Sequence, residues 1–427
     1  MILKAFLVLY RLAWVILTPL VLVYIWRRGR RDPAYSTHLR ERFGSYPALP
    51  QNPIWIHAVS LGETRSAVPL ARDLLNAGEV VVFTHFTPAG RKEAQRAFAD
   101  EIAEGRVASV WVPLDLFWVF SRFFKACHPK IGLAMEIEIW PAMVFAARRA
   151  GVPFYMCNAQ YPSTSIARDS KGLRLRQRIM TGVTGAFVKS QLQADRFAGV
   201  GVPNIHITGE LRFDQPIPQR LLDAATTFAP QISDRPVTII ASAIEGEDEL
   251  FIQAIHDLKS NDTNPLVIYV PRAPERFDEV ATMLADAGLS VVRRSDLFDD
   301  TLGRTQAWPS DVDVLLGDSL GEMYFFLSLA DRVVVGGGFH PKGAHNIIEP
   351  LALGKPVVTG PFTHTIENPF VEAEAAGVAL SVPDGPALVA ALQGNAWATP
   401  DQITAFMADH IGASARTAAA ILDVLTD

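Results

Sequence analysis

The sequence predicts an α/β protein with two Rossmann-like domains, whose parallel sheets face a central cleft, behind an N-terminal membrane-anchor helix. Three observations lead to this fold. Short apolar runs rich in β-branched residues alternate with amphipathic stretches, which is typical of parallel sheets covered by helices on both faces. The alternation is interrupted once, by the proline-rich stretch 214–220. A continuous apolar segment, 5–26, comes before the first run.

The apolar segment 5–26 is long enough for a helix to cross a hydrocarbon core of about 30 Å. Positive charges follow it directly, at Arg27, Arg28, Arg30 and Arg31. They predict that the rest of the chain stays on the cytoplasmic face of the inner membrane. A signal peptide would carry its charges in front and a small-residue cleavage site behind. Arg11 within the segment leaves open a helix that lies in the membrane interface. Membrane lipids, above all anionic ones, are expected partners.

The order of apolar runs predicts the domains. Strands are expected in the first half at 54–59, 80–86, 108–113, 130–138, 153–160, 185–190 and 205–211. Strands are expected in the second half at 237–243, 265–271, 289–294, 313–318, 332–338, 356–360 and 378–382. The resulting division is an anchor at 1–30, Rossmann-like domains at 31–213 and 221–401, a linker at 214–220 and a C-terminal helix at 402–427 that packs back on the first domain.

Composition excludes some classes of protein. The formal net charge of −6 in 427 residues argues against nucleic acid as a partner. The two cysteines, Cys127 and Cys157, lie outside any Cys-x-x-Cys pattern, so we expect reduced structural thiols. Asp311-Val312-Asp313 superficially matches a metal-binding Asp-x-Asp, but here it leads into an expected strand, and we discount it as a metal site. We therefore predict no metal site and no cofactor.

Ligands of such sheets bind beyond the carboxyl ends of the strands, so residues there are the candidates for chemistry. Ser60-Leu61-Gly62-Glu63 follows the first strand. Two interpretations stay open for Glu63: a general base in the cleft, or the glutamate of a Ser-x-x-Glu capping box. Gly62 beside it would let a sugar or another chain approach closely.

Glu136 and Glu138 are predicted to close the strand at 130–138. Two carboxylates that face the same way in a buried strand are unfavourable unless they are satisfied, which favours a position in the cleft. His57 and His85 also lie on strands, and we expect both to be packed in the core rather than catalytic.

Further candidates follow strands of the second half. Residues 242–249 open a helix, which either is capped there or presents amides to an anion. Arg272 follows the strand 265–271 and suits a phosphate or carboxylate, because its guanidinium offers paired N–H donors. Gly337 and Gly338 permit close backbone approach to a ligand. Asn346 and Glu349, at i and i+3 of an expected helix start, share a face and could hold a ribose, or form a plain Asn cap.

These motifs, taken in order, resemble the Kdo (3-deoxy-manno-octulosonic acid) transferase family over almost the whole chain. HAVSLGET, MEIEIWP, TGELRFD, VPRAPERF, LGDSLGEM and AHNIIEPLALGKPVVTGP each resemble a family segment. The resemblance implies an inverting glycosyltransferase of the GT-B type that moves Kdo from CMP-Kdo to a phosphorylated, acylated lipid A precursor in lipopolysaccharide synthesis. It implies an acceptor domain in the first half and a nucleotide-sugar domain in the second.

By the same resemblance, the catalytic base falls on Glu63 and a second catalytic carboxylate on Glu136. The acceptor or its phosphate would be bound by Gly62, Glu138 and Arg212. The implied CMP-Kdo positions are Arg272, Gly321, Glu322, Gly337, Gly338, Asn346 and Glu349. CMP is already a good leaving group, so the resemblance requires no catalytic metal.

The chain departs from the family pattern at several positions. Gln160, Ile244 and Ala273 replace an arginine and two histidines of the motifs, Ala344 replaces a glycine, and Arg212 replaces a lysine. Three functions are therefore kept open. One is Kdo transfer, and another is a membrane-anchored paralogue that binds nucleotide or lipid without turnover or with altered specificity. The third is a GT-B enzyme that uses a UDP-sugar. Retention of Glu63 favours an enzyme, because glutamine would serve a cap equally well.

Overall fold

The computed structural model describes residues 2–232, 235–260 and 264–426. These residues form two compact units, one comprising the chain up to Gln215 together with the chain from His410 onward, and the other Pro216–Asp409. Unit 1 and unit 2 below denote these two parts. The division after Gln215 falls inside the stretch 214–220. The second division, at His410, lies later in the chain than the expected 402.

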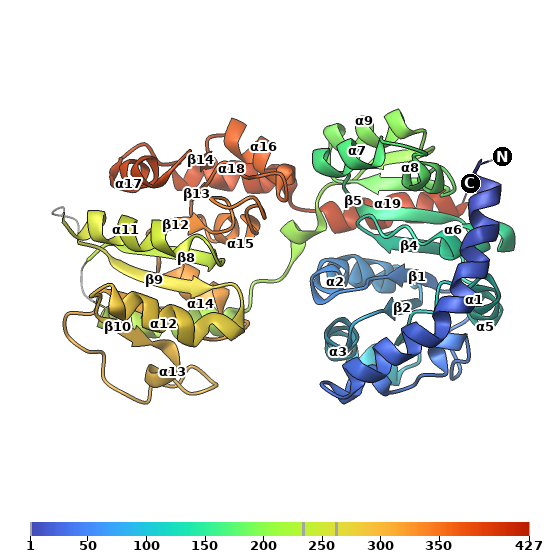
Figure 1. The fold of residues 1–427 in the computed structure, drawn as a ribbon, viewed down its shortest axis with the longest axis horizontal. Coiled ribbons are helices and arrows are strands. Elements are labelled where there is room, and N and C mark those ends of the chain that lie inside the picture. Colours follow the sequence, from blue (N-terminus) through green and yellow to red (C-terminus); the bar gives the residue numbers. More distant parts are fainter. Residues whose placement is uncertain (1, 233–234, 261–263, 427) are drawn as a thin grey trace. The chain divides into compact units, whose positions relative to one another are not determined.

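Within the described residues, unit 1 contains a parallel sheet of seven strands in the order β3-β2-β1-β4-β5-β6-β7 (Figure 1). The strands are β1 (Ile54–His57), β2 (Val81–His85), β3 (Val107–Trp111), β4 (Ile131–Met135), β5 (Phe154–Ala159), β6 (Gly185–Val188) and β7 (Ile205–Ile207). The strand order reverses between β1 and β4, and such a switch point opens a crevice at the carboxyl ends of the two strands.

Unit 2 repeats this plan, again with seven parallel strands among its described residues, in the order β10-β11-β9-β8-β12-β13-β14. The strands are β8 (Val237–Ala243), β9 (Leu266–Pro271), β10 (Val291–Arg293), β11 (Val314–Leu316), β12 (Arg332–Val335), β13 (Val357–Thr359) and β14 (Ala379–Ser381). Here the switch point lies between β8 and β12. Each expected strand is present. A strand covered by helices on both faces needs apolar side chains on both faces, and this requirement produces the nearly continuous apolar runs from which the strands were predicted.

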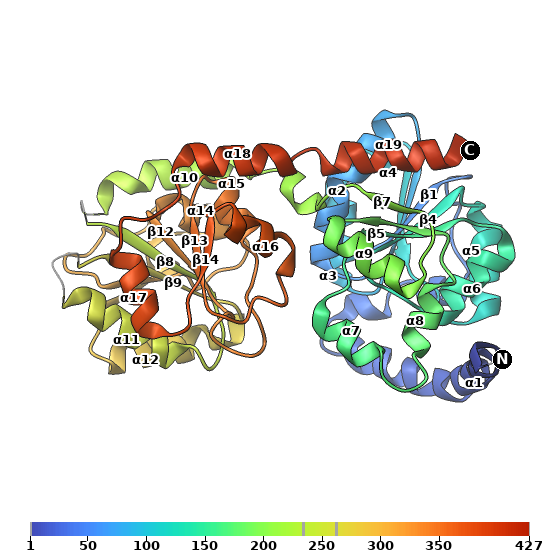
Figure 2. The ribbon, with the colours of Figure 1, turned by 90° about the horizontal axis from the view of Figure 1, so that it is seen from above.

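Helices cover both faces of the first sheet. The helices of unit 1 are α1 (Ile2–Gly29), α2 (Leu61–Asn76), α3 (Pro88–Ala97), α4 (Ala99–Ala103), α5 (Phe117–Cys127), α6 (Pro141–Ala150), α7 (Ser163–Asp169), α8 (Leu175–Met180), α9 (Gln191–Val200) and α19 (Ala413–Thr426), with 3-10 turns η1 (Pro33–Ser36), η2 (Glu41–Phe43) and η3 (Leu211–Asp214). Helices α2, α3 and α19 pack on one face, and α5, α6, α8 and α9 on the other (Figure 2).

The helices of unit 2 are α10 (Gln219–Phe228), α11 (Asp248–Lys259), α12 (Phe277–Asp286), α13 (Arg294–Leu297), α14 (Met323–Leu329), α15 (Ile348–Ala352), α16 (Glu367–Ala375), α17 (Gly385–Gln393) and α18 (Pro400–His410), with 3-10 turns η4 (Ala229–Gln231) and η5 (Pro274–Arg276). Helices α11, α12 and α17 share one apolar core with the sheet.

The expected helix at 402–427 consists of two helices, α18 and α19. Gly412, with a φ of +85°, separates them. Asp214 accepts hydrogen bonds from the backbone N–H groups of Gly412 and Ser414, both at 2.6 Å. This carboxylate therefore fixes the start of α19, which packs on α2 within unit 1.

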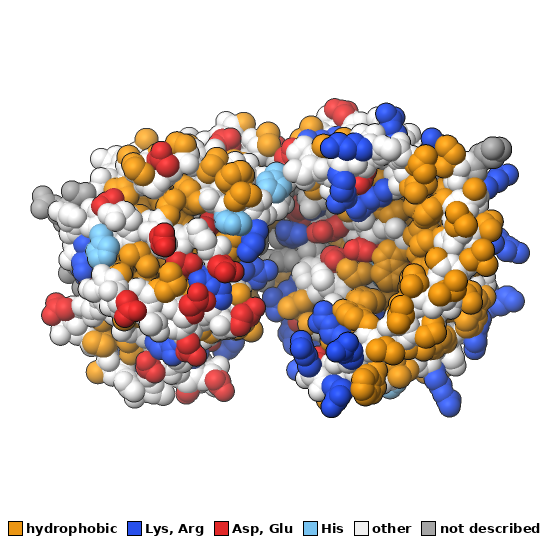
Figure 3. Space-filling view, in the orientation of Figure 1, with side chains coloured by type: hydrophobic (Ala, Val, Ile, Leu, Met, Phe, Trp, Pro, Cys, Tyr) orange, Lys and Arg blue, Asp and Glu red, His pale blue; other side chains and the backbone are white. Residues whose placement is uncertain are grey.

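Helix α1 lies along the body of unit 1 (Figure 1). It is long and apolar enough to cross a membrane, with a mean hydropathy of 2.2 and none of its most apolar stretch buried. Tyr10 donates to the Asp115 carboxylate at 2.5 Å, and the guanidinium of Arg11 lies 3.8 Å from the centre of the Phe117 ring. The outward face stays apolar and exposed (Figure 3), with Ile16 at 74% exposure.

Candidate functional site

Glu63 lies beyond the carboxyl end of β1, in the first turn of α2. The Ser60 hydroxyl oxygen accepts the Glu63 N–H at 3.3 Å, and the Glu63 carboxylate accepts the Val59 N–H at 2.8 Å and the Ser60 hydroxyl at 2.9 Å. The capping-box interpretation is thus correct as local geometry. It does not exclude chemistry, because the same turn stands at the β1/β4 switch point.

The environment of Glu63 favours its neutral form. The pKa of Glu63 is raised to about 8, mainly by burial and also by the charges of Glu136 and Glu138, against the hydrogen bonds from Val59 and Ser60, which lower it. A carboxyl group with a pKa near the operating pH is suited to exchange a proton with a substrate.

Glu136 and Glu138 lie in the turn after β4. The expectation that they close a strand at 130–138 is therefore wrong. Strand β4 ends at Met135, and Glu136 has a φ of +57° in the left-handed region. The two carboxylates are therefore placed by a tight turn and not by the pleat of a strand. The Trp140 indole N–H donates to Glu138 at 2.8 Å. Burial is the main cause that raises the pKa of Glu138.

Arg212 lies in η3, which follows β7, and contacts the turn after β4. Its guanidinium donates to the Glu136 carboxylate at 2.7 Å. The pair is partly exposed, with 31% of the Arg212 side chain and 26% of the Glu136 side chain accessible. Gly62 is also exposed, and a Cβ atom added there would meet nothing within 4 Å. The fold of the described residues thus leaves the space over Gly62 open.

A buried ionic network lies behind this site, and the sequence interpretation missed it. Lys189 and Glu210 form an ion pair at 2.6 Å, with 1% and 2% of their side chains exposed. Burial would raise the pKa of Glu210, but the charges of Lys189 and Arg212 outweigh it and hold that pKa at about 2. Lys189 also donates to Gln160 at 3.1 Å. A cation therefore lies beside Gln160, where the family pattern has an arginine.

In unit 2, the buried Glu247 organises the β8/β12 switch point. Its carboxylate accepts hydrogen bonds from the backbone N–H groups of Ile244 at 3.2 Å, Gly337 at 2.7 Å and Phe339 at 2.9 Å. Burial is the main cause that raises the Glu247 pKa. Sequence reasoning missed Glu247, although it lies within the stretch 242–249. That stretch thus contributes a carboxylate that binds amides of the β12 loop.

Gly337 and Gly338 are explained by contacts of the chain with itself. Gly337 has a φ of +85°, and an added Cβ atom would collide with the Gly343 carbonyl. At Gly338 an added Cβ atom would collide with the Thr359 hydroxyl and with Gly360. The close approach expected here is made by neighbouring backbone, and a ligand is not needed to explain either glycine.

Arg272 and His345 lie close together at the carboxyl ends of β9 and β12. Arg272 is exposed, and no hydrogen bond or ion pair holds its guanidinium among the residues that the structure describes. The pKa of His345 is lowered to about 4, mainly by burial and also by the charge of Arg272. The His345 Nε2 atom is buried without a hydrogen-bond partner in the described parts of the chain. An exposed cation thus lies beside an unsatisfied imidazole, a residue that the sequence interpretation did not select.

The expected helix start at 345–349 is wrong in one detail. Helix α15 begins at Ile348, so Asn346 lies outside it and only Glu349 stands in its first turn. The Asn346 side chain accepts the Ile348 N–H at 3.0 Å, which is a local turn and not the expected pair on one helix face. Burial and the nearby charge of Glu349 both raise the pKa of Tyr324.

Gly321 and Glu322 precede α14. Gly321 has a φ of +81° and open space where a side chain would stand. The Glu322 carboxylate is engaged by the Arg294 guanidinium, at 2.5 and 2.7 Å, and by the Ser319 hydroxyl at 2.5 Å. Glu322 is therefore placed to shape this loop, with only 8% of the residue exposed.

The two strand histidines are core residues, as expected. His57 contacts the Thr84 hydroxyl at 3.0 Å and His85 the Ala58 carbonyl at 3.0 Å. Burial lowers both pKa values to about 3. Asp313 of the Asp-x-Asp sequence is paired with Lys259 at 2.6 Å.

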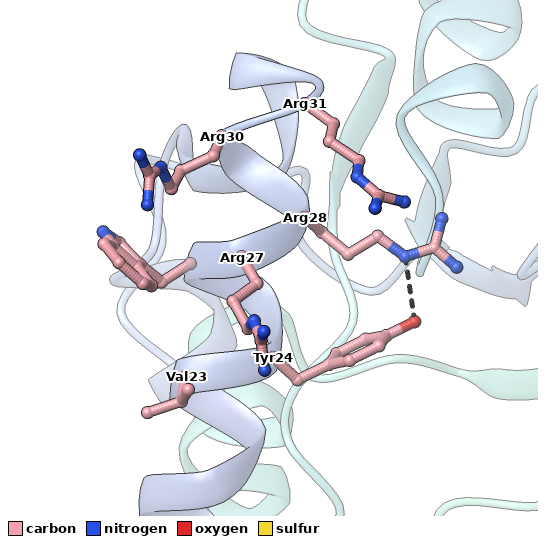
Figure 4. Close-up of a pocket in the computed structure, with 7 residues that line it drawn as sticks. Val23, Tyr24, Arg27, Arg28, Arg30 and Arg31 are labelled. Carbon is pink, nitrogen blue, oxygen red and sulfur yellow. Dashed lines mark hydrogen bonds between the residues drawn. The ribbon is translucent and has the colours of Figure 1, made fainter.

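A basic site lies at the end of α1. Four arginines surround a cavity of about 710 Å³ there (Figure 4): Arg27, Arg28, Arg30 and Arg31. The Arg28 guanidinium donates to the Tyr24 hydroxyl at 3.1 Å. The expected positive cluster is thus gathered beside the apolar helix, where anionic headgroups would meet it.

Comparison with known proteins places the chain in a family. The family model described as 3-Deoxy-D-manno-octulosonic-acid transferase (kdotransferase) matches residues 37–215. The 3-deoxy-D-manno-octulosonic acid transferase of Bordetella pertussis is 38% identical over 433 residues, which cover 98% of each chain. This chain belongs to the Kdo transferase family. The Kdo transferase of Haemophilus influenzae is 33% identical, over 83% of this chain and 81% of its own.

A solved glycosyltransferase from Rickettsia africae has the same fold as this Kdo transferase family member. It superposes with a TM-score of 0.58 at 13% identity and covers 88% of this chain and 98% of its own. The expected α/β fold of the GT-B type, with two Rossmann-like units, is therefore confirmed, as is the resemblance to the family.

Proposed function

We propose that this protein is an inverting glycosyltransferase that moves Kdo from CMP-Kdo to a hydroxyl of a phosphorylated, acylated lipid A precursor in lipopolysaccharide synthesis. The observation that carries the proposal is the position of Glu63. A half-buried carboxyl group with a raised pKa stands at the switch point of unit 1, beside Glu136 and Glu138, in a chain of the Kdo transferase family.

Glu63 is the general base. It takes the proton from the acceptor hydroxyl while that oxygen forms a bond to the anomeric carbon of Kdo. The bond between this carbon and the phosphate oxygen of CMP breaks, and CMP leaves with the electron pair. Attack opposite to the leaving group inverts the anomeric centre. Glu136, held by Arg212, assists at the same edge of the sheet.

The acceptor contacts unit 1 at Gly62 and Glu138. The open space over Gly62 supports close approach of a sugar. Arg212 is held by Glu136, so its contribution to acceptor binding is to fix that carboxylate and to add positive charge near the phosphate.

The CMP part of the donor binds unit 2. Arg272 receives its phosphate, because this guanidinium is exposed and lies beside the unsatisfied His345. Asn346 and Glu349 hold the ribose. Gly337 and Gly338 give the loop its shape, and Gly321 and Glu322 form a second loop at the same edge of the sheet.

Transfer proceeds without a metal ion or cofactor in this proposal. CMP is a good leaving group, and the positive charge of Arg272 can stabilise the phosphate that departs. Activity that persists in the presence of a strong chelator would agree with this, whereas activity that is lost with the chelator and restored by a divalent cation would contradict it.

Helix α1 and its arginines bring the protein to the inner membrane, with both units on the cytoplasmic face. The exposed apolar face of α1 and the cluster Arg27–Arg31 support this orientation. The same face is suited to a lipid acceptor, which is itself embedded in the membrane.

The test is transfer by the full chain, in detergent, to a tetraacyl lipid A precursor with CMP-Kdo generated in the assay. We expect a Kdo-bearing lipid product, and stabilisation of the fold by CMP in a thermal shift assay. Arg272→Ala should abolish the CMP-dependent shift. No product from the wild-type chain, together with a clear CMP-dependent shift, would contradict lipid A as acceptor and favour the non-catalytic or altered-specificity paralogue.

A further inference from the structure

A second cavity, of about 490 Å³, lies between α1 and the body of unit 1. Trp14 and Val21 of α1 form one wall. The opposite wall comes from the loops that follow β2, β3 and β4, with Phe86, Leu114 and Ile139. We call this cavity the α1 groove. Its walls are mainly apolar, and its size is that of a typical ligand site.

The α1 groove borders the surface that would meet the membrane. Val15 and Ile16, on the outward face of the same helix, are 67% and 74% exposed. Exposed apolar side chains in such a row mark a membrane or partner surface. The groove and this exposed apolar face thus belong to the same helix.

Arg42 lines the groove with a guanidinium that forms no ion pair in the part of the chain that the structure describes, whereas the Asp115 carboxylate of the same lining accepts hydrogen bonds from Tyr10 and from the N–H groups of Ala142 and Met143. Arg42 is 1% exposed. Its Nε and Nη1 atoms have no hydrogen-bond partner among residues 2–232, 235–260 and 264–426. Its Nη2 atom is 3.5 Å from the Phe86 carbonyl, and its guanidinium lies 4.5 Å from the centre of the Trp111 ring. A buried guanidinium with unused N–H donors is unfavourable unless an anionic oxygen satisfies it.

Trp140 connects the groove with the carboxylates of the candidate site. Its ring lines the groove, and its indole N–H donates to Glu138 at 2.8 Å. Glu138 and Glu136 in turn act electrostatically on Glu63. One tryptophan thus separates an apolar groove from the catalytic edge of the sheet.

We propose that the α1 groove binds one acyl chain of the acceptor lipid, with an acceptor phosphate at Arg42 and the acceptor sugar presented to Glu63. This inference rests on the proposed function, and it deepens that function by assigning a lipid-chain site. Helix α1 is then part of the acceptor site as well as a membrane attachment.

The acceptor fits the groove better than a bulk phospholipid does. A phospholipid could supply a chain and a phosphate, but it offers no sugar hydroxyl to the carboxylates beyond Trp140. The acceptor carries all of these groups on one molecule. Arg42 and Trp140 both line the groove, and Trp140 contacts Glu138 of the carboxylate cluster.

Photo-cross-linking tests the occupant without requiring turnover. The full chain in detergent is exposed to an acceptor lipid with a diazirine at the end of one acyl chain, and in parallel to phosphatidylglycerol with the same chain. We expect the acceptor to label groove residues, such as Trp14 and Leu114, much more than phosphatidylglycerol does. Equal labelling by both lipids, or labelling confined to Val15 and Ile16, would overturn the proposal.

A variant that fills the groove supplies the kinetic test. Val21→Trp should raise the KM for the tetraacyl acceptor at least about 10-fold more than the KM for an acyl-free phosphorylated disaccharide. Val15→Trp adds the same side chain to the outward face and should not do so. Equal effects of Val21→Trp on both acceptors would contradict the assignment. Failure of the wild-type chain to transfer to either acceptor would instead contradict the proposed function, and the cross-linking result would still decide the groove.

Discussion

The Glu136 carboxylate and the Arg212 guanidinium lie 2.7 Å apart and join segments separated by 76 positions in the chain. Glu136 stands in a left-handed turn after β4, and Arg212 in η3 after β7. The pair holds one carboxylate of the candidate site in place. Its partial exposure limits its contribution to stability.

Replacing Arg212 should therefore affect catalysis much more than folding. We expect Arg212→Met to lower kcat by about 10- to 100-fold, because a freed Glu136 no longer has a fixed position. The free energy of unfolding should change by less than about 1 kcal/mol. Arg212→Lys keeps the charge and should recover part of kcat. Transfer kinetics and urea unfolding measure these two effects, and an unchanged kcat in Arg212→Met would refute this role.

In contrast to the Glu136–Arg212 pair, the Lys189–Glu210 pair should contribute strongly to the stability of the fold. Both side chains are buried, so Lys189→Met leaves an unpaired charge and should lower the free energy of unfolding by about 3–5 kcal/mol. Lys130→Met is the matched control, because its partner Glu79 is bound at 2.7 Å but Lys130 is 41% exposed. Urea unfolding at pH 7 would compare them, and similar small losses would show that the buried network is not needed for stability.

Glu210 also predicts a pH dependence of stability. Its pKa in the folded state, about 2, lies below the ordinary value of 4.5. The contribution of this group to stability is therefore complete above about pH 4.5 and is lost as the pH falls toward 2. Glu210→Gln should lose less stability over this acid range than the wild type does. Unfolding measured between pH 5 and pH 3 would check the difference, and parallel curves would contradict the assignment.

Glu247 should be essential to the shape of the donor loop. Removing its carboxylate in Glu247→Ala leaves buried N–H groups of Gly337 and Phe339 unsatisfied, which costs about 2–4 kcal/mol. We expect a lower melting temperature and loss of the CMP-dependent thermal shift. Glu249→Ala removes an exposed carboxylate in the first turn of α11, the helix that follows Glu247, and should leave the melting temperature and the CMP-dependent shift near those of the wild type. A normal CMP-dependent shift in Glu247→Ala would argue against this role.

The strands could be predicted from the sequence because each apolar run carries its own signal. The capping-box interpretation of Ser60–Glu63 also depends only on local sequence, and the structure confirms it. The turn at Glu136 was not predicted. Because Glu136 has an apolar residue on either side, the sequence there resembles a strand that continues.

The partners of buried charges could not be predicted, because they depend on strand order. Lys189 follows β6 and Glu210 follows β7, and only the folded sheet brings them together beside Gln160. Glu247 reaches Gly337 across 90 positions in the chain. The contact of Tyr10 in α1 with Asp115 could not be predicted for the same reason, because no local pattern marks a contact between residues 105 positions apart.

The pH dependence of transfer by wild type and Glu63→Gln is the measurement that tests the central claim most directly. Glutamine can keep the cap, since its oxygen accepts the Val59 N–H and its amide can donate to Ser60, so the variant should fold. For the wild type, kcat/KM should rise with pH as Glu63 loses its proton near a pKa of about 8 and level off above it.

Glu63→Gln should be slower by about 10²-fold or more and should lack this pH dependence. The raised folded pKa also means that the contribution of Glu63 to stability is present below pH 4.5 and is lost as the pH rises toward 8, a loss that the variant should not show. Equal turnover by the two proteins, with the same pH profile, would leave Glu63 as a helix cap and contradict its assignment as the base.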